Sequence, residues 1–188
     1  MVNITFKGEP YVGIKVRLRP VEMEDVNAIM EHWNDYDSRK YLGNTIPMST
    51  KMEEDWVNYV HNMAKSQKGY HFVIENKDTK EFLGTCGLED INWITRSATL
   101  GIGIHNPVNH NQGYGTDTML CLIKFGFLVL NLHRIELWVY EYNKRGIHVY
   151  EKVGFKKVGK KREAAFFEGK YYNIIEMDIL YTELQNGI

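Results

Sequence analysis

The sequence predicts an α/β domain built around one mixed sheet. The chain has 188 residues, of which 44% are hydrophobic and 25% charged, a length and composition typical of one globular domain. Its hydrophobic pattern changes between the alternation of strands and the period of helices in the order β-α-α-β-β-β-α-β-α-β-β. Neither an internal repeat nor a Pro-, Gly- or Ser-rich linker divides the chain. We therefore expect a single domain over 1–188, with its core at about 14–182.

The first part of the chain predicts one strand and two helices. Apolar and basic residues alternate over 14–19, and Pro20 ends this strand. Apolar residues recur at helical spacing over 26–33, so a helix follows. A second helix is expected to begin with a capping box formed by Thr50 and Glu53. Its expected apolar face comprises Met52, Trp56, Tyr59, Val60 and Met63.

The middle of the chain predicts three strands followed by a helix. The strand-like runs span 70–75, 81–90 and 97–104. Segments 76–79 and 92–95, each beginning with Asn, mark the turns between them. Residues 116–130 then form a predicted helix with one apolar face. That face comprises Met119, Leu120, Ile123 and Phe127.

The last part of the chain predicts a strand, a short helix and a hairpin. Apolar residues alternate with other types over 135–140, which is the pattern of a strand. A short helix is expected over 143–153, and two final strands meet near Glu168 and Gly169.

Charge and cysteine content narrow the classes of function. Lys and Arg total 23 against 24 Asp and Glu, so the formal net charge is −1. Proteins that hold nucleic acid through phosphate contacts usually carry a basic excess, so we expect no nucleic-acid partner. Cys86 and Cys121 are isolated, which favours buried, reduced thiols and a cytoplasmic location. The first ten residues lack the apolar core of a signal peptide, and no window is apolar enough to span a membrane, so we expect no membrane partner.

A strand, a glycine-bearing loop and a helix start follow one another over 100–116. Gly113 and Gly115 let the loop backbone approach a ligand closely, and the first N–H groups of a helix are free donors. Such an arrangement suits a phosphate or pyrophosphate group. The loop lacks the Gly-Lys-Ser/Thr ending of a P-loop and the third glycine of a dinucleotide fingerprint. On its own, the pattern is more often an ordinary turn and helix cap.

A second stretch makes the interpretation specific. It reads Asn-x-x-Gly-x-x-x-Tyr-x-x-x-Gly-Phe and is formed by Asn143, Gly146, Tyr150, Gly154 and Phe155. Together with His110-x-x-Gly113-x-Gly115, it resembles the acetyl-CoA sites of the GCN5-related N-acetyltransferase (GNAT) superfamily. The resemblance covers most of the chain and is closest to the branch that holds spermidine acetyltransferases and ribosomal-protein N-terminal acetyltransferases. The segments that resemble the spermidine enzymes in particular are 90–93 with 96–98, 130–133 and 166–171.

The resemblance implies one N-acetyltransferase domain with a mostly antiparallel sheet, about four flanking helices and a splayed central strand pair. It also implies acetyl-CoA as the co-substrate and no metal, and the seven His residues lack the spacing of metal ligands. The strand segment of Ile102, Gly103 and Ile104 would lend backbone groups to the pantetheine, and Asn143 would bind the amide arm. The pyrophosphate would bind to His110, Asn111, Gln112, Gly113, Tyr114, Gly115 and Thr116.

The phosphate-binding loop departs from the family pattern at two positions. His110 stands where the family favours Gln or Arg, and Asn111 stands where Gly is usual. We therefore expect backbone amides to hold most of the pyrophosphate. Cofactor affinity is expected to be weaker or dependent on pH, because His titrates near neutrality.

Tyr150 is the expected general acid, which donates a proton to the departing CoA thiolate. A thiol pKa of about 8.5 and a phenol pKa of about 10 make this a mild demand. The alternative is an ordinary core tyrosine on a short amphipathic helix. Glu89 is the expected base for the acceptor amine, with Asp90 and Glu75 as rivals. The alternative for Glu89 is an exposed strand carboxylate that only increases solubility.

Residues 21–38 are acidic and contain no Lys or Arg. The acids are Glu22, Glu24, Asp25, Glu31, Asp35 and Asp37. In the family this part of the chain walls the acceptor site, so we expect Glu31, Trp33 and Asp35 to bind the acceptor and the acids to attract a polycation. A solvated helix face explains the acids equally well.

The predicted function is acetyl-CoA-dependent transfer of an acetyl group to a primary amine, directly and without a covalent enzyme intermediate. A polyamine or other small amine is the leading acceptor. The first alternative is the N-terminal α-amine of a protein such as a ribosomal protein. The second is a non-catalytic acyl-CoA-binding regulatory module. Relatives with this C-terminal hairpin often self-associate, so a homo-oligomer is a further expectation.

Overall fold

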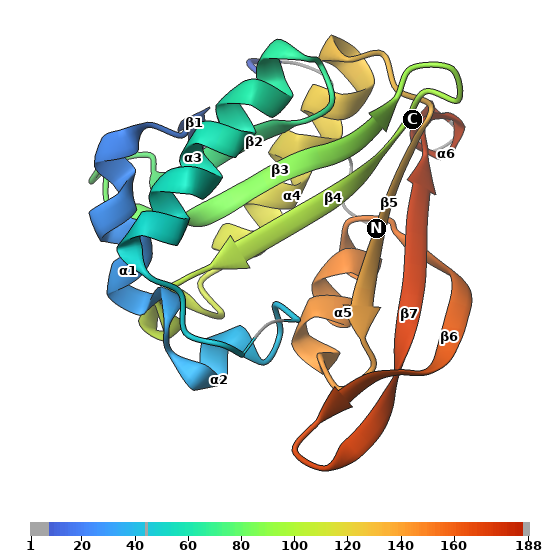
Figure 1. Ribbon diagram of the computed structural model, residues 1–188. Helices are drawn as coiled ribbons and strands as arrows, with labels where there is room; N and C mark the ends of the chain where they lie inside the picture. Colours follow the sequence, from blue (N-terminus) through green and yellow to red (C-terminus); the bar gives the residue numbers. More distant parts are fainter. Residues whose placement is uncertain (1–7, 44, 186–188) are drawn as a thin grey trace.

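The computed structural model describes residues 8–43 and 45–185, and within them seven strands form one open sheet. The strand order is β1-β2-β3-β4-β5-β7-β6, and neighbours are antiparallel except β4 and β5, which are parallel. The strands are β1 (Val16–Pro20), β2 (Tyr70–Asn76), β3 (Phe82–Asn92), β4 (Ser97–Ile104), β5 (Arg134–Tyr140), β6 (Lys156–Phe167) and β7 (Lys170–Leu180). The α/β fold with a mixed, mostly antiparallel sheet is confirmed (Figure 1).

The sheet opens between β4 and β5. Within the described sheet, pairing between them is confined to Ser97–Thr99 with Arg134–Glu136, after which the two strands separate (Figure 1). β4 stays paired with β3 as far as Ile104, and β5 stays paired with β7 as far as Tyr140. The edge of β4 that faces the opening therefore has backbone N–H and C=O groups available to a ligand. This confirms the predicted splayed strand pair.

Helices cover both faces of the sheet. In Figure 1, α1 and α3 lie in front of β2 and β3, whereas α4 lies behind β3 and β4. The helices are α1 (Val26–Trp33), α2 (Tyr36–Arg39), α3 (Thr50–Lys65), α4 (Tyr114–Lys124), α5 (Lys144–Lys152) and α6 (Tyr181–Gln185). In the described part of the chain, four of them have eight residues or more, which agrees with the expected number. The short α2 and α6 were not predicted, nor were the 3₁₀ turns at Met23–Asp25 and Pro107–Asn109.

Hydrophobic cores lie on both faces of the sheet. The larger core packs α4 and α5 against the central strands, and its most deeply buried side chains include Leu83, Leu88, Leu122, Ile135 and Met177. The smaller core lies under α1 and α3 and consists of Val21, Val26, Val57, Val60 and Val73. Central strands are thus covered from both sides, which is why they carry long apolar runs.

Both cysteines are buried and free. Cys86 and Cys121 belong to the larger core, as the sequence predicted. None of the helices in the described ranges has the length and apolarity to cross a bilayer. The expectation about a signal peptide concerned the first ten residues, of which 1–7 lie outside the described residues.

The start and the apolar face of α3 differ from the prediction. Ser49, not Thr50, is the N-cap, and its Oγ accepts a hydrogen bond from the Met52 N–H at 3.2 Å. The buried face comprises Glu53, Val57, Val60 and Met63. Met52 and Tyr59 are 49% and 58% exposed. Each lies next to a buried residue in sequence and so points about 100° away around the helix.

α4 begins two residues earlier than predicted and does not continue as a regular helix to residue 130. A wider π-helical turn, Phe125–Val129, follows it. Gly126 in this turn lies so close to the sheet that an added Cβ would be 2.6 Å from Ile135 Cδ1. Apolar spacing does not distinguish a regular turn from a widened one, so the sequence pattern alone predicted one continuous helix.

Candidate active site

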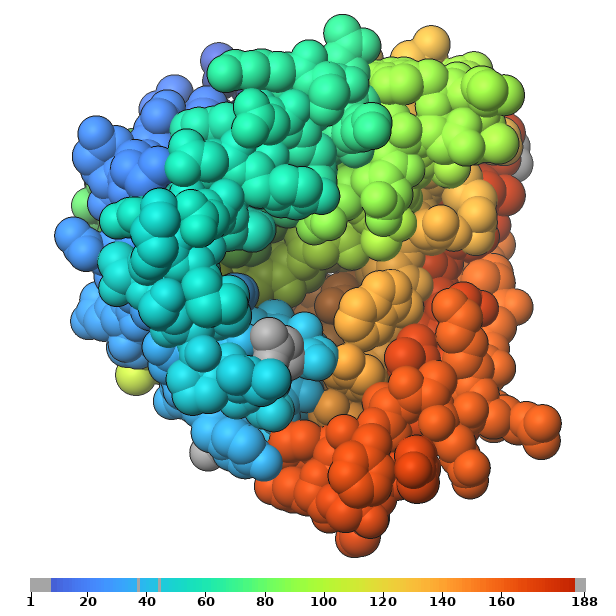
Figure 2. Space-filling model, viewed as in Figure 1, coloured from blue at the N-terminus to red at the C-terminus, as the bar shows by residue number. Residues whose placement is uncertain are grey.

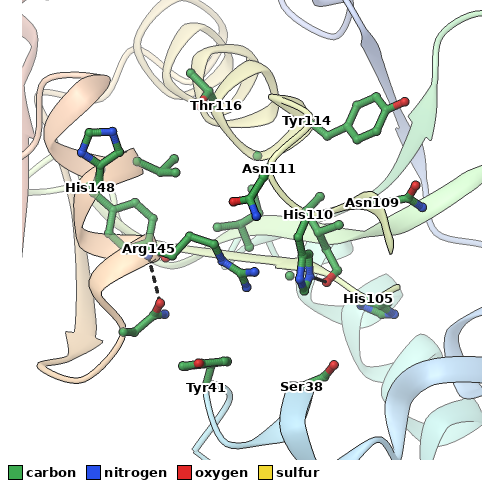
Figure 3. Close-up of a pocket in the computed structure, with 18 of the residues that line it drawn as sticks. Ser38, Tyr41, His105, Asn109, His110, Asn111, Tyr114, Thr116, Arg145 and His148 are labelled. Atoms are coloured by element: carbon green, nitrogen blue, oxygen red, sulfur yellow. Dashed lines mark hydrogen bonds between the residues drawn. The ribbon is translucent and has the colours of Figure 1, made fainter. Parts of the chain in front are cut away.

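A cavity of about 350 Å³ lies at the opening between β4 and β5, and we call it the α4-side cavity. Its walls come from β4, the start of α4, α5 and the segment around α1 and α2 (Figure 3). Most of the predicted site residues line it: Trp33, Ile102, Gly103, Ile104, His110, Asn111, Gly113, Tyr114, Gly115, Thr116, Asn143 and Tyr150. Gln112 is not among the lining residues, and its Nε2 donates a hydrogen bond to the Val108 carbonyl oxygen at 2.8 Å.

The start of α4 presents backbone N–H groups to this cavity. Gly113 is the N-cap, with a left-handed φ of 87° and no capping side chain. Asn111 also has a positive φ, of 61°, which Asn tolerates better than most residues with a side chain. The turn leaves the first N–H groups of α4, on Tyr114, Gly115 and Thr116, free of helical partners. Their partial positive charge suits a phosphate group.

Asp117, in the first turn of α4, fixes this helix end to the N-terminal segment. Its buried carboxylate accepts hydrogen bonds from the backbone N–H groups of Ile14, Lys15 and Val16 at 3.1, 2.7 and 3.0 Å. Gly13 has no room for a side chain, since an added Cβ would be 2.3 Å from Asp117 Oδ2. β1 therefore begins at Val16 and not at residue 14, because the backbone N–H groups of the two residues before it bind the carboxylate and not a neighbouring strand.

His110 ties the predicted phosphate-binding loop to β4. Its Nε2 is 3.0 Å from the Ile104 carbonyl oxygen, so this nitrogen donates the hydrogen bond. Burial lowers the pKa of His110, this hydrogen bond opposes the shift, and the Arg145 guanidinium lowers the pKa further. The imidazole is therefore neutral at pH 7. Its geometry makes it a positioning group for the loop.

Asn143 and Gly146, two residues of the Asn-x-x-Gly-x-x-x-Tyr motif, together form the start of α5. Asn143 is the N-cap of α5, and its Oδ1 accepts a hydrogen bond from the Gly146 N–H at 2.9 Å. An added Cβ at Gly146 would be 2.7 Å from Asn143 Nδ2, so a side chain at this position would displace the Asn143 amide. Both residues line the α4-side cavity. The cap thus also holds the Asn143 amide at the cavity wall.

Tyr150 and Arg145 line the same cavity from α5. Burial raises the pKa of the Tyr150 hydroxyl to about 12, against a smaller opposing effect of Arg145. The phenol is therefore protonated at neutral pH and can donate a proton. Figure 3 shows the Arg145 side chain extending from α5 toward Asn111 and His110. Arg145 was not predicted as a site residue, although a basic residue two positions after Asn143 was a usable signal for an anion site.

A second hollow, of about 180 Å³, adjoins the first on the side of α1 and α3, and we call it the α3-side hollow. The two share the residues Trp33, Leu42, Ile102 and Gly103. The α3-side hollow contains Glu89, the predicted base, and also Glu53, Trp56 and His71, which were not predicted. Figure 2 shows the molecule hollowed on this face, between the part that holds α1–α3 and the strands beside it.

Two carboxyl groups of the α3-side hollow have raised pKa values. Burial raises the pKa of Glu53 to about 7, although the Arg39 charge opposes the shift. Burial and, to a smaller extent, Asp90 raise the pKa of Glu89. His71 Nε2 lies 3.4 Å from Glu89 Oε1 without forming a hydrogen bond, and burial lowers the His71 pKa to about 4. Glu89 is therefore a stronger base than an ordinary carboxylate, and His71 is neutral.

The acidic segment at 21–38 brings Trp33 to the site but not the two carboxylates expected with it. Trp33 stacks on His105 with ring centroids 4.8 Å apart and lines both hollows. The Glu31 side chain is 71% exposed, and Asp35 is the N-cap of α2. Neither Glu31 nor Asp35 lines either hollow.

Other carboxylates of interest are engaged elsewhere. Glu75, a rival base, lies 2.5 Å from Arg19 Nε, and Asp25 lies 2.6 Å from the same guanidinium. The Asp37 side chain lies outside the described residues. Among the residues that the structure describes, no group of three His, Cys, Asp or Glu side chains is placed to hold a metal ion.

The chain is similar to known acetyltransferases over most of its length. Residues 15–156 match the acetyltransferase (GNAT) domain family. The spermidine N(1)-acetyltransferases of Vibrio cholerae and Escherichia coli K12 are each 29% identical to it, over 92% and 87% of this chain and 96% and 85% of their own lengths. An uncharacterised N-acetyltransferase of Bacillus licheniformis, p20, is 27% identical over 90% of this chain and 94% of its own.

The fold has a close counterpart among solved structures. The crystal structure of spermidine N-acetyltransferase from Vibrio cholerae, in complex with CoA and spermine, matches with a TM-score of 0.83 and 28% identity. The match covers 92% of this chain and 99% of that one. With the family match, the splayed strands and the free helix start beside them, the chain belongs to the GNAT family of N-acetyltransferases.

Proposed function

We propose that the protein transfers the acetyl group of acetyl-CoA to a primary amine of a polyamine or similar small amine, by direct transfer, in the cytoplasm. One observation carries the acceptor class: an acidic, aromatic hollow joins the predicted cofactor cavity at Ile102 and Gly103. The names of the similar spermidine N-acetyltransferases support the same class. The buried, free thiols of Cys86 and Cys121 support the location.

The α4-side cavity fits acetyl-CoA, which supplies an acetyl group activated as a thioester. The first N–H groups of α4 and the Arg145 guanidinium would hold the pyrophosphate. The unpaired edge of β4, with Ile102 and Ile104, would bind the pantetheine backbone-to-backbone. Asn143 presents its amide to the same cavity.

Tyr150 and Glu89 would move the two protons that the reaction requires. A primary amine with a pKa of about 10.4 costs about 4–5 kcal/mol to deprotonate at pH 7, so a base helps. Glu89, whose pKa is raised by burial, would accept that proton directly or through one water. The Tyr150 hydroxyl would donate a proton to the departing sulfur, which leaves as a thiol. The attacking nitrogen loses its second proton as the amide forms, and this proton would restore the Tyr150 hydroxyl. Glu89 then releases the first proton to solvent, so atoms and charges balance without a covalent enzyme intermediate.

Thiol release from acetyl-CoA, measured with a panel of acceptors, tests the proposal. The panel contains spermidine, spermine and short peptides with free Ser, Ala or Met N-termini. We expect turnover with the polyamines and none with the peptides. Turnover with the peptides alone would replace the proposal with an N-terminal α-amine acetyltransferase. Acetyl-CoA binding without turnover of any acceptor would replace it with an acyl-CoA-binding regulatory module.

A further inference from the structure

Three glycines of β3 and β4 line the floor of the α3-side hollow. Gly87 and Gly101 are cross-strand partners in β3 and β4, and Gly103 lies two residues further along the same face of β4. An added Cβ at Gly101 would be 3.7 Å from its nearest neighbour, Glu89 Oε1, which is an ordinary contact distance. The space above Gly101 and Gly103 is therefore open, whereas an added Cβ at Gly87 would be 2.9 Å from His71 Nδ1. A ligand can lie directly on β4.

The walls of the hollow are acidic and aromatic. Glu53 and Trp56 come from α3, Glu89 from β3, and Trp33 from the end of α1. Glu53 is 3% exposed, which is rare for a carboxylate without full compensation of its charge. Burial raises its pKa to about 7 in spite of Arg39, so Arg39 does not compensate it fully. An arriving cation would stabilise the charged carboxylate, and indole faces attract the same kind of group.

His71 is an independent sign that a ligand belongs here. Its side chain is 8% exposed and lines the hollow, and its Nε2 has no hydrogen-bond partner among the described residues. Buried polar side-chain atoms nearly always have a partner, so one without any calls for an explanation. A ligand that carries N–H groups supplies it, because the neutral His71 ring can accept one of them through Nε2.

We propose that the α3-side hollow binds the second, non-reacting ammonium group of a diamine or polyamine acceptor, with the Glu53 carboxylate as its counter-charge. This inference rests on the proposed function and adds the element that selects the acceptor. The reacting amine lies where the two hollows meet, at Ile102 and Gly103, and the hydrocarbon chain crosses the glycine floor. A monoamine has nothing to place beside Glu53, so Glu53 distinguishes polyamines from monoamines.

Glu53→Gln tests the proposal, with Glu54→Gln as the matched control. Glu54 is the next residue of α3, but its side chain is 41% exposed and lies 3.3 Å from Lys51 Nζ. We expect Glu53→Gln to raise the KM for spermidine about tenfold or more, since a hydrogen-bonded ion pair is lost. The KM for acetyl-CoA and for n-butylamine should stay within about twofold, and Glu54→Gln should change neither constant. An unchanged spermidine KM, or an equal rise for n-butylamine, would overturn the proposal.

A second variant, Gly101→Ala, tests the proposal even if Glu53→Gln fails to fold. A binding measurement tests it even if no turnover is observed. The added methyl group has room but occupies the glycine floor, so the KM for spermidine should rise while the melting temperature stays close to that of the wild type. Calorimetric titration of spermidine into protein saturated with CoA measures the hollow directly. If the wild type binds spermidine and Glu53→Gln does not, the proposed ammonium site is supported, even when no turnover is observed. In that case only the proposed reaction is wrong. Wild-type binding that Glu53→Gln leaves intact overturns the hollow.

Discussion

In the proposed reaction, Tyr150 is the residue that protonates the leaving group. Tyr150→Phe removes the hydroxyl and keeps the ring, so we expect kcat to fall about 10²- to 10³-fold with an acetyl-CoA Kd within about twofold of the wild type. Stopped thiol-release assays and calorimetry measure the two quantities. Tyr171→Phe, at a 65% exposed position of β7, is the matched control and should change neither.

The pH profile offers a second readout of Tyr150. Because burial raises its pKa to about 12, its ionisation should not lower kcat anywhere below about pH 10. The acceptor amine loses its proton over the same range, so kcat/KM should rise with pH. A fall of kcat with a midpoint at or below about pH 10, absent from Tyr150→Phe, would show that the phenol pKa is not raised and would contradict this account.

His105 should make stability depend on pH. Burial lowers its pKa to about 4, below the ordinary 6.5, so between these values the unfolded chain binds more protons than the native one. Stability therefore falls as pH falls from about 6.5 toward 4, by up to about 3 kcal/mol for one such group. His105→Gln can keep the contact with Thr85 Oγ1, 3.2 Å from His105 Nε2, but cannot titrate.

The comparison between wild type and His105→Gln isolates this histidine. His71 contributes with the same sign, whereas the raised pKa of Glu53 contributes with the opposite sign, and both are present in the two proteins. Urea unfolding at pH 7 and pH 4.5 should therefore show the destabilisation caused by His105→Gln shrinking by about 2–3 kcal/mol at the lower pH. A gap of constant size would mean that His105 titrates normally.

Single residues of the site were predictable where they share a local motif. Tyr150 and Asn143 lie on one short helix, so their spacing in the sequence is also their spacing in space. Glu53 and His71 were not predicted, because they lie on α3 and β2, two elements that come together only when the helix packs on the sheet. The carboxylates of the acidic segment failed to reach either hollow for a related reason: composition shows that a helix is acidic, but not which side it turns to the sheet.

Among the secondary-structure elements, α4 depends on a contact that no local pattern shows. Asp117→Ala would leave three backbone N–H groups without their acceptor, so we expect a loss of about 2–3 kcal/mol of unfolding free energy. The acetyl-CoA Kd should also rise several-fold, since the same helix start would bind the pyrophosphate. Urea denaturation and calorimetry measure the two effects.

Two variants control this prediction. Asp117→Asn keeps one carbonyl acceptor and should lie between Asp117→Ala and the wild type. Asp55→Asn removes a carboxylate that is 62% exposed on α3 and should leave stability within about 0.5 kcal/mol. An unfolding midpoint of Asp117→Ala equal to that of the wild type would show that the three hydrogen bonds do not fix the helix end.

Elements were predictable to the extent that periodicity determines them. The strand over 97–104 was predicted with its observed bounds, because turn residues precede it and a glycine-bearing loop follows it in the sequence. Its separation from β5 came from the family resemblance, since the alternation of side chains continues unchanged beyond Thr99 while the backbone pairing stops. Register between strands far apart in the sequence is a tertiary property, and the pattern of one strand does not contain it.

On the scale of the whole molecule, two adjoining hollows meet at β4 beside the opening in the sheet, and the proposed reaction places one substrate in each. The α4-side cavity and the α3-side hollow share Ile102 and Gly103, so both ligands can be bound at once and meet there. Cys86 and Cys121 are buried, and burial raises the pKa of the Cys121 thiol to about 12, so neither is placed as a nucleophile.

Direct transfer in a ternary complex is the reaction order that we propose, and kinetics can test it. Initial rates at varied acetyl-CoA and spermidine concentrations should give intersecting double-reciprocal lines, because both substrates must be bound before chemistry. Protein incubated with acetyl-CoA alone should keep its intact mass, and the double replacement of Cys86 and Cys121 by Ala should retain the same kinetic pattern. Parallel lines together with an acetylated protein would require a covalent intermediate, and the two hollows would then act in succession instead of together.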